Sequence, residues 1–126
     1  MTKYIDGFVL VVPRDKTEEY KKMASEGRDM WMKHGALEYY ECIGDDLEAK
    51  EMGELKSLAF TELAKANSDE TVWFSFIVYK SKEHRDEVTK KVMDEMSEKD
   101  KDNVDVQMPF DMKRMAVGGF KVEVEG

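Results

Sequence analysis

Six residues carry the polar, aromatic and thiol groups that a small-molecule site would use. They are Cys42, Asp45, Asp46, Trp73, Asp111 and Arg114. Carboxylates beside a guanidinium and an indole can orient a small polar ligand at the mouth of a cavity. The same charges could instead form a structural salt bridge between a loop and the last strand. The sequence shows no base next to the thiol that would activate it as a nucleophile, so it predicts no catalytic residue.

A second group contains two imidazoles, a carboxylate and a phenol. Its members are Asp6, His34, Tyr79 and His84. Zinc or iron could use two of these histidines and the aspartate, but each histidine has an ordinary role at a helix end. We therefore predict no metal and no cofactor. Asp6 lies within an apolar strand, where a bond to the backbone or to a tyrosine hydroxyl is expected.

Composition limits the classes of protein that need consideration. The chain has 126 residues, a net charge of −8 and one cysteine. This length fits one domain, residues 1–126, and the acidic balance argues against nucleic-acid binding. One cysteine excludes an internal disulfide and a site with several cysteine ligands. The sequence has neither a run of about 18 apolar residues nor a signal-peptide pattern, so we expect a cytoplasmic protein without membrane contact.

Apolar, β-branched and aromatic runs predict the strands of the domain. These runs are Tyr4 to Val12, the segment ALEYYECIG, Thr71 to Tyr79 and about Lys113 to Val124. The segment LKSLAFTELA is ambiguous, and we interpret it as a strand that forms a hairpin with Thr71 to Tyr79. The acidic segment Asp45 to Glu54 is expected to be a mobile surface loop.

Two helices are predicted from helical spacing of apolar residues. The first runs from about Lys16 to His34, and Asp15 with Glu18 resembles a capping box at its start. The second begins after the cap residue Ser81. Its buried stripe is expected to contain His84, Val88, Val92 and Met96.

The order of these elements predicts an α+β fold, a ferredoxin-like antiparallel sheet with both helices on one face. The first strand and Thr71 to Tyr79 are apolar on both sides. Two helices cannot cover both faces, so a second copy is expected to cover the other one, giving a homodimer.

Four segments resemble the YbaA-like family, a domain-of-unknown-function family of small bacterial proteins. They are KYIDGFVLVVP, YYECIGDD, VWFSFIVYKSKEHRDEV and MPFDMKRMAVGGF, and the match covers almost the whole chain. The resemblance implies a dimeric α/β barrel and no established activity. The chain departs from the family pattern in two places. It has Leu58, Ala59 and Phe60 where the family has Thr-Asp-Phe, and it has Lys80 where the family has a proline. The missing acid argues against a site at that position.

Strand direction sorts the candidate residues between the two ends of the sheet. The first group falls at one end and the second group at the other. Arg114 should therefore pair with Asp45, Asp46 or Asp111 rather than with Asp6. Gly118 and Gly119 point to opposite faces, which fits close packing, a bulge or a ligand lying against the sheet.

Two functions remain open from the sequence. One is a non-catalytic dimeric module that binds a small molecule or another protein. The alternative is a cofactor-independent enzyme resembling the oxygenases and isomerases of dimeric α/β barrels, an inference from fold analogy. A cavity of about 300 Å³ or more with a histidine or an acid pointing into it would favour the enzyme.

Overall fold

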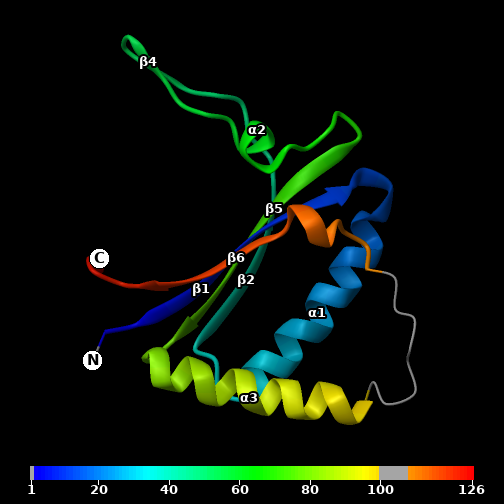
Figure 1. Cartoon of the computed structure of the whole chain (residues 1–126), viewed down its shortest axis with the longest axis vertical. Helices are drawn as coiled ribbons and strands as arrows, with labels where there is room; N and C mark the ends of the chain where they lie inside the picture. Colours follow the sequence, from blue (N-terminus) through cyan, green and yellow to red (C-terminus); the bar gives the residue numbers. More distant parts are fainter. Residues whose placement is uncertain (1, 100–107) are drawn as a thin grey trace.

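The computed structural model describes residues 2–99 and 108–126. Its main sheet contains β1 (Tyr4–Pro13), β2 (Glu38–Ile43), β5 (Glu70–Tyr79) and β6 (Ala116–Lys121). The order across the sheet is β2-β5-β1-β6, and every neighbouring pair is antiparallel (Figure 1). This arrangement confirms the predicted ferredoxin-like sheet.

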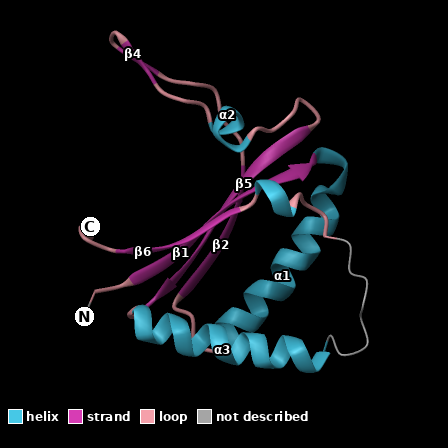
Figure 2. Ribbon diagram, in the orientation of Figure 1, coloured by secondary structure: helices cyan, strands magenta, loops and turns pink. Residues whose placement is uncertain are grey.

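Two long helices, α1 (Thr17–Lys33) and α3 (Lys82–Lys99), lie on the same face of the sheet (Figure 2). The core lies between them and the sheet, where Leu10 and Trp73 contact Tyr20 of α1. On the α3 side, Val88 and Val92 are almost completely buried against the strands. Within the described residues, none of the helices is both long enough and apolar enough to span a membrane.

The helix boundaries were predicted well, but one cap was not. Ser81 accepts a hydrogen bond from the backbone N–H of His84 at 3.1 Å, as predicted for the second helix. Before the first helix, residues Arg14–Lys16 form a 3-10 turn and α1 has no side-chain cap. The Asp15 capping box is therefore wrong, because the chain turns into the helix one turn earlier.

The segment between β2 and β5 differs most from the prediction. Residues Glu51–Met52 (β3) pair with Leu55–Lys56 (β4) around Gly53, whose φ is +69°. A short helix, α2 (Phe60–Ala64), follows. The predicted irregular loop thus contains a hairpin, and the predicted hairpin partner of β5 is wrong because β5 already pairs with β1 and β2. We call residues 45–64 the arm; it projects from the body of the domain (Figure 1).

The last strand is shorter than predicted at its start. Residues Met112–Arg114 form a 3-10 turn, and the Asp111 side chain accepts from the backbone N–H of Lys113 at 2.9 Å. This capping interaction holds the chain in a turn, so the strand begins at Ala116 rather than Lys113.

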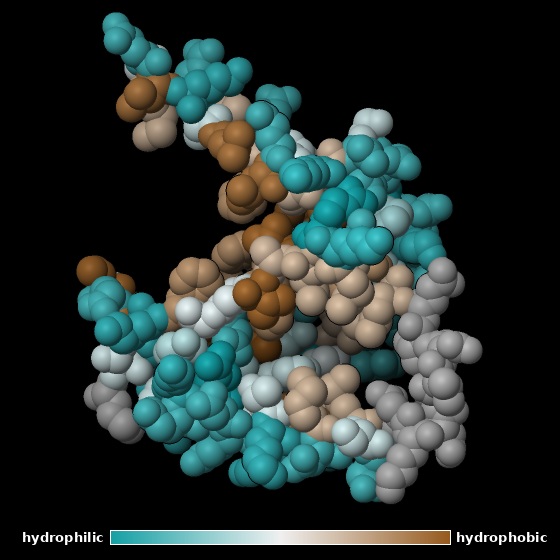
Figure 3. All heavy atoms as spheres, viewed as in Figure 1, coloured by the Kyte–Doolittle hydropathy of each residue, from teal (hydrophilic) through white to brown (hydrophobic). Residues whose placement is uncertain are grey.

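The face of the sheet opposite the helices, which we call the open face, is apolar and largely uncovered. Tyr40, Phe74 and Phe120 lie there with 47%, 45% and 61% of their surfaces exposed. The Tyr40 and Phe74 rings each lie near Phe76, at centroid distances of 5.0 and 5.8 Å. Hydrophobic residues border the hollowed region between the arm and the end of the sheet that carries the termini (Figure 3).

Candidate functional site

The open face contains a hollow of about 630 Å³. We call it the hollow; strands β1, β5 and β6 form its floor. Its described lining residues are Ile5, Gly7, Phe8, Val9, Phe74, Phe76, Ala116, Val117, Gly118 and Phe120. All of them are apolar or glycine, so the hollow presents side chains suited to an apolar ligand.

Two glycines shape the floor of the hollow. Gly7 and Gly118 are directly opposite each other in the β1–β6 register. A Cβ atom added to Gly7 would lie 3.3 Å from the ring of Phe120, and one added to Gly118 would lie 3.4 Å from it. The bare backbone therefore lets this aromatic ring approach both strands closely.

Gly119 faces the helices and makes room for a different ring. A Cβ atom there would contact the Tyr4 hydroxyl and lie 2.8 Å from Tyr4 Cε2. The two adjacent glycines thus accept one aromatic side chain on each face, which is the close packing that the sequence suggested.

A smaller depression of about 300 Å³ lies at the base of the arm. It brings together three residues of the first predicted group, Cys42, Asp45 and Asp46, beside Phe60 and Phe74. Phe74 borders both this depression and the hollow.

The polar groups of this depression have no arrangement that would activate a nucleophile among the described contacts. The carboxylate of Asp46 accepts from Lys50 Nζ at 2.7 Å, and Cys42 is exposed. Activation of a thiol requires a base or a cation beside it, so the depression carries no catalytic assignment.

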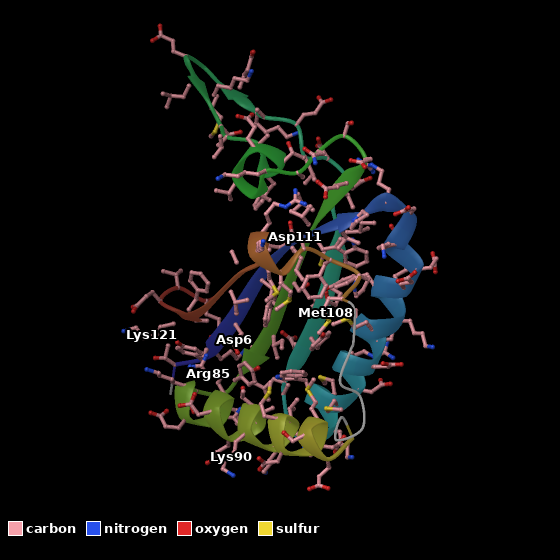
Figure 4. The ribbon with its side chains drawn as sticks, turned by 45° about the vertical axis from the view of Figure 1, so that its right-hand side comes forward. Asp6, Arg85, Lys90, Met108, Asp111 and Lys121 are labelled. Carbon is pink, nitrogen blue, oxygen red and sulfur yellow. The ribbon has the colours of Figure 1, made fainter. Side chains whose placement is uncertain are left out.

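Arg114 binds two carboxylates away from that depression. Its Nε donates to Asp111 at 2.7 Å, and Nη2 and Nη1 donate to the two oxygens of Glu70 at 2.6 and 2.8 Å. Nη1 also donates to the carbonyl oxygen of Lys65 at 2.7 Å. The expected pairing of Arg114 with Asp111 is confirmed (Figure 4). Glu70 was missed as a partner because it precedes an apolar strand and was assigned to the turn before it.

These bonds shift the pKa values of all three groups. Hydrogen bonding from Arg114 lowers the pKa of Glu70 and of Asp111 below their ordinary values of 4.5 and 3.8. The two carboxylates in turn raise the pKa of the Arg114 guanidinium. The cluster ties the turn before β6 to the start of β5 and to Lys65, directly after the arm, through four hydrogen bonds from the guanidinium.

Trp73 lies on the other side of the sheet from the depression. It is 3% exposed and its ring packs edge-on against Tyr20 at 4.8 Å. Its Nε1 is buried without a hydrogen-bond partner in the part of the chain that the structure describes. The six residues of the first group are therefore divided among the depression, the Arg114 cluster and the core beneath the helices.

The second predicted group is likewise divided. Asp6 accepts from Arg85 Nη1 at 2.7 Å, and the two side chains point toward each other (Figure 4). His34 Nε2 lies 3.0 Å from a carboxylate oxygen of Glu95. His84 Nδ1 accepts from the backbone N–H of Lys80 at 3.0 Å.

The Tyr79 hydroxyl is bonded to α1, and the Asp6 carboxylate lies near it. The hydroxyl accepts from Trp31 Nε1 at 3.0 Å. Burial raises its pKa, and the charge of the nearby Asp6 carboxylate raises it further. The hydrogen bond to Asp6 that the structure shows comes from Arg85 rather than from a tyrosine or the backbone, and it was missed because α3 presents Arg85 from 79 residues away.

A half-buried carboxylate beneath the helices was missed entirely. Glu41 accepts from the Tyr20 hydroxyl at 2.9 Å, from the Tyr39 hydroxyl at 2.8 Å and from the Ser75 hydroxyl. Burial, followed by the charge of Glu41, raises the pKa of both tyrosines. The available signal was an acid at the centre of the aromatic strand segment YYECI.

Comparisons with known proteins agree with the fold and provide no activity. The family model described as "Protein of unknown function (DUF1428)" matches residues 3–112. The uncharacterized protein YbaA of Escherichia coli K12 is 40% identical over 119 residues, which cover 94% of this chain and 95% of YbaA. YbaA of Shigella flexneri has the same identity and coverage.

One solved structure shares the fold at low sequence identity. It is the crystal structure of a dimeric ferredoxin-like protein from an uncultured marine organism, with a TM-score of 0.59 and 13% identity. The similarity covers 100% of this chain and 98% of that protein. It supports the ferredoxin-like fold described above.

Proposed function

The chain belongs to the DUF1428 family of proteins of unknown function, and we propose that it is a homodimer that binds a small apolar molecule between two facing sheets. This membership confirms the resemblance to YbaA-like proteins. The observation that carries the proposal is the hollow of about 630 Å³ on the open face, whose described lining is entirely apolar or glycine. Its volume falls within the range of about 300–1,000 Å³ that is usual for ligand pockets.

The exposed surface of the open face supports the dimer. Tyr40, Phe74 and Phe120 are each about half exposed. With roughly 200 Å² per aromatic residue, these three leave on the order of 300 Å² in water. The apolar side chains of the arm add to this area, which places the surface among exposed apolar patches of the size that often marks an interaction site. The dimeric state of the marine ferredoxin-like protein supports homodimerisation.

The chemistry of the hollow favours binding over catalysis. An enzyme of the alternative class would need an acid, a base or an activated nucleophile beside its substrate. Among the described lining residues of the hollow, none carries an ionisable side chain. An enzyme was expected to have a cavity of about 300 Å³ or more with a histidine or an acid pointing into it. The hollow is large enough, but its described lining includes neither residue type, so a non-catalytic binding module is the better proposal.

The experiment that tests the proposal combines oligomeric state with ligand retention. Native mass spectrometry of protein purified from its own host should show a dimer whose mass includes a retained apolar ligand. The neutral probe N-phenyl-1-naphthylamine should bind the emptied dimer with increased fluorescence. Ala116→Phe places a ring in the hollow and should abolish both retention and probe binding.

The matched control is Met93→Phe, which adds a ring to an exposed position of α3 on the helix side. It should bind the probe as the unmodified protein does. A stable monomer at micromolar concentration would contradict the dimer. A dimer that retains nothing and binds no probe would contradict the ligand-binding function.

A further inference from the structure

The arm exposes large apolar side chains that the protomer does not use. Met52 and Leu55, next to the hairpin tip, are 69% and 75% exposed. Leu58 and Leu63 are 61% and 59% exposed, and Phe60 is 44% exposed. Such a cluster on one projecting segment is typical of a surface that another molecule covers.

The base of the arm lies on the open face of the sheet. Leu47 and Ala64 pack with the buried residues Val11 and Val72 of β1 and β5. Beyond this anchor, the hairpin is held by its own bonds. Ser57 donates its backbone N–H to the Lys50 carbonyl at 2.8 Å, and its hydroxyl accepts from the Lys50 N–H at 2.7 Å. The protomer thus fixes the base of the arm, while the apolar tip has no role in the described core.

The apolar surface of the arm is continuous with the hollow. Phe60 from the arm and Phe74 from β5 both line the depression at the arm base, and Phe74 also lines the hollow. Arm and open face therefore border one concave apolar region, visible as the indented side of the molecule (Figure 3). A molecule that covers the open face would meet the arm as well.

The length of the arm matches a second copy of this chain. The seven residues from Leu47 to Gly53 are six steps along the chain, which can span at most about 20 Å at about 3.3 Å per step. Facing sheets lie about 10 Å apart, so the arm is long enough to cross the gap and reach the partner's sheet. Twofold symmetry would make the contact reciprocal, because each arm would meet the same surface on the other subunit.

We infer that the arm clasps the second subunit and closes the side of the ligand site between the two sheets. Met52 and Leu55 then contact the partner, and each hollow is complete only when the partner's arm lies beside it. This inference rests on the proposed dimer. The ligand class remains a small apolar molecule, because the side chains that the arm adds are also apolar.

Photocrosslinking tests the inference directly. Leu55 is replaced by p-benzoyl-phenylalanine, and mixed ¹⁴N/¹⁵N dimers are irradiated and analysed by peptide mass spectrometry. We expect crosslinks between light and heavy chains that end on open-face residues of the partner. The same photoreactive residue at Met93 on α3 is the control and should give none of them.

The possible outcomes separate the inference from the proposed function. A dimer in which Leu55 crosslinks only within its own chain, or not at all, would overturn the clasp and leave the dimer standing. A monomer would overturn the proposed function together with the inference.

A charged arm tip provides a second readout. The double variant Met52→Asp and Leu55→Asp should raise the dimer dissociation constant by about tenfold or more and release the naphthylamine probe. Its far-UV circular dichroism should not change, because both side chains lie outside the described core. Lys56→Asp alters the charge of the same hairpin without removing an apolar contact and should have little effect. An unchanged dissociation constant and unchanged probe binding in the double variant would overturn the clasp.

Discussion

Truncation of Phe74 should weaken the proposed dimer strongly. This residue is 45% exposed in the protomer. If association buries the remainder, about 90 Å² of apolar surface leaves water per subunit, taking roughly 200 Å² for the residue. At about 25 cal/mol per Å², this contributes about 2 kcal/mol per subunit and about 4 kcal/mol per dimer. Phe74→Ala should therefore raise the dissociation constant by about a thousandfold.

Sedimentation equilibrium over a dilution series measures this change. The matched control is Met93→Ala, since Met93 is 46% exposed but lies on α3, on the far side of the sheet. Thermal unfolding of each variant reports the loss of Phe74 contacts within the protomer, such as the one with Phe76. The reasoning is refuted if Phe74→Ala shifts the dissociation constant no more than Met93→Ala does.

Three further predictions concern the protomer itself. The pKa values of Glu70 and Asp111, the carboxylates bound by Arg114, are lowered in the folded protein. Their contribution to the free energy of unfolding is therefore complete above their ordinary pKa values of 4.5 and 3.8, and it is lost as the pH falls through their pKa values in the folded state. In Arg114→Met, the melting temperature should therefore decrease less steeply below about pH 5 than in the unmodified protein. The same pH dependence in both proteins would contradict this prediction. Gly119→Ala should lower the free energy of unfolding in urea by about 1–3 kcal/mol, because the new Cβ meets the Tyr4 ring. Gly118→Ala should lower it less, and equal losses in the two variants would contradict this packing. Glu41→Leu should lower the free energy of unfolding by about 2–5 kcal/mol, because three hydroxyls lose their acceptor. Glu41→Gln should lower it less, because glutamine retains one acceptor oxygen.

The sheet and its helices could be predicted because their patterns are local. The run Tyr4 to Val12 alternates between two apolar faces, and Val88 and Val92 recur at helical spacing. Strand direction then placed Arg114 near Asp111 and away from Asp6, which the structure confirms. That prediction required only the antiparallel order of the strands.

Long-range partners and weak local signals were harder to predict. Glu41 is bonded by hydroxyls from α1, β2 and β5, and no local pattern indicates that three donors converge on one carboxylate. The arm hairpin depends on two residue pairs around Gly53. Its acidic composition resembles that of a solvent-exposed loop, and a two-residue strand has too few positions to show alternation.

The division of polar groups between the two faces of the sheet bears on how a ligand would be selected. Asp6 and Glu41 both bond on the helix side, where Arg85 and three hydroxyls satisfy them. Charges that are removed from water are costly unless they are paired or hydrogen-bonded, and these bonds meet that requirement on the helix side. On the other face, the β1–β6 register places Gly7 opposite Gly118, and this pairing shapes the hollow. Because its described lining has no charge to match, selection in the hollow would rest on shape and apolar area, and a charged analogue of a bound ligand should be rejected for its desolvation cost.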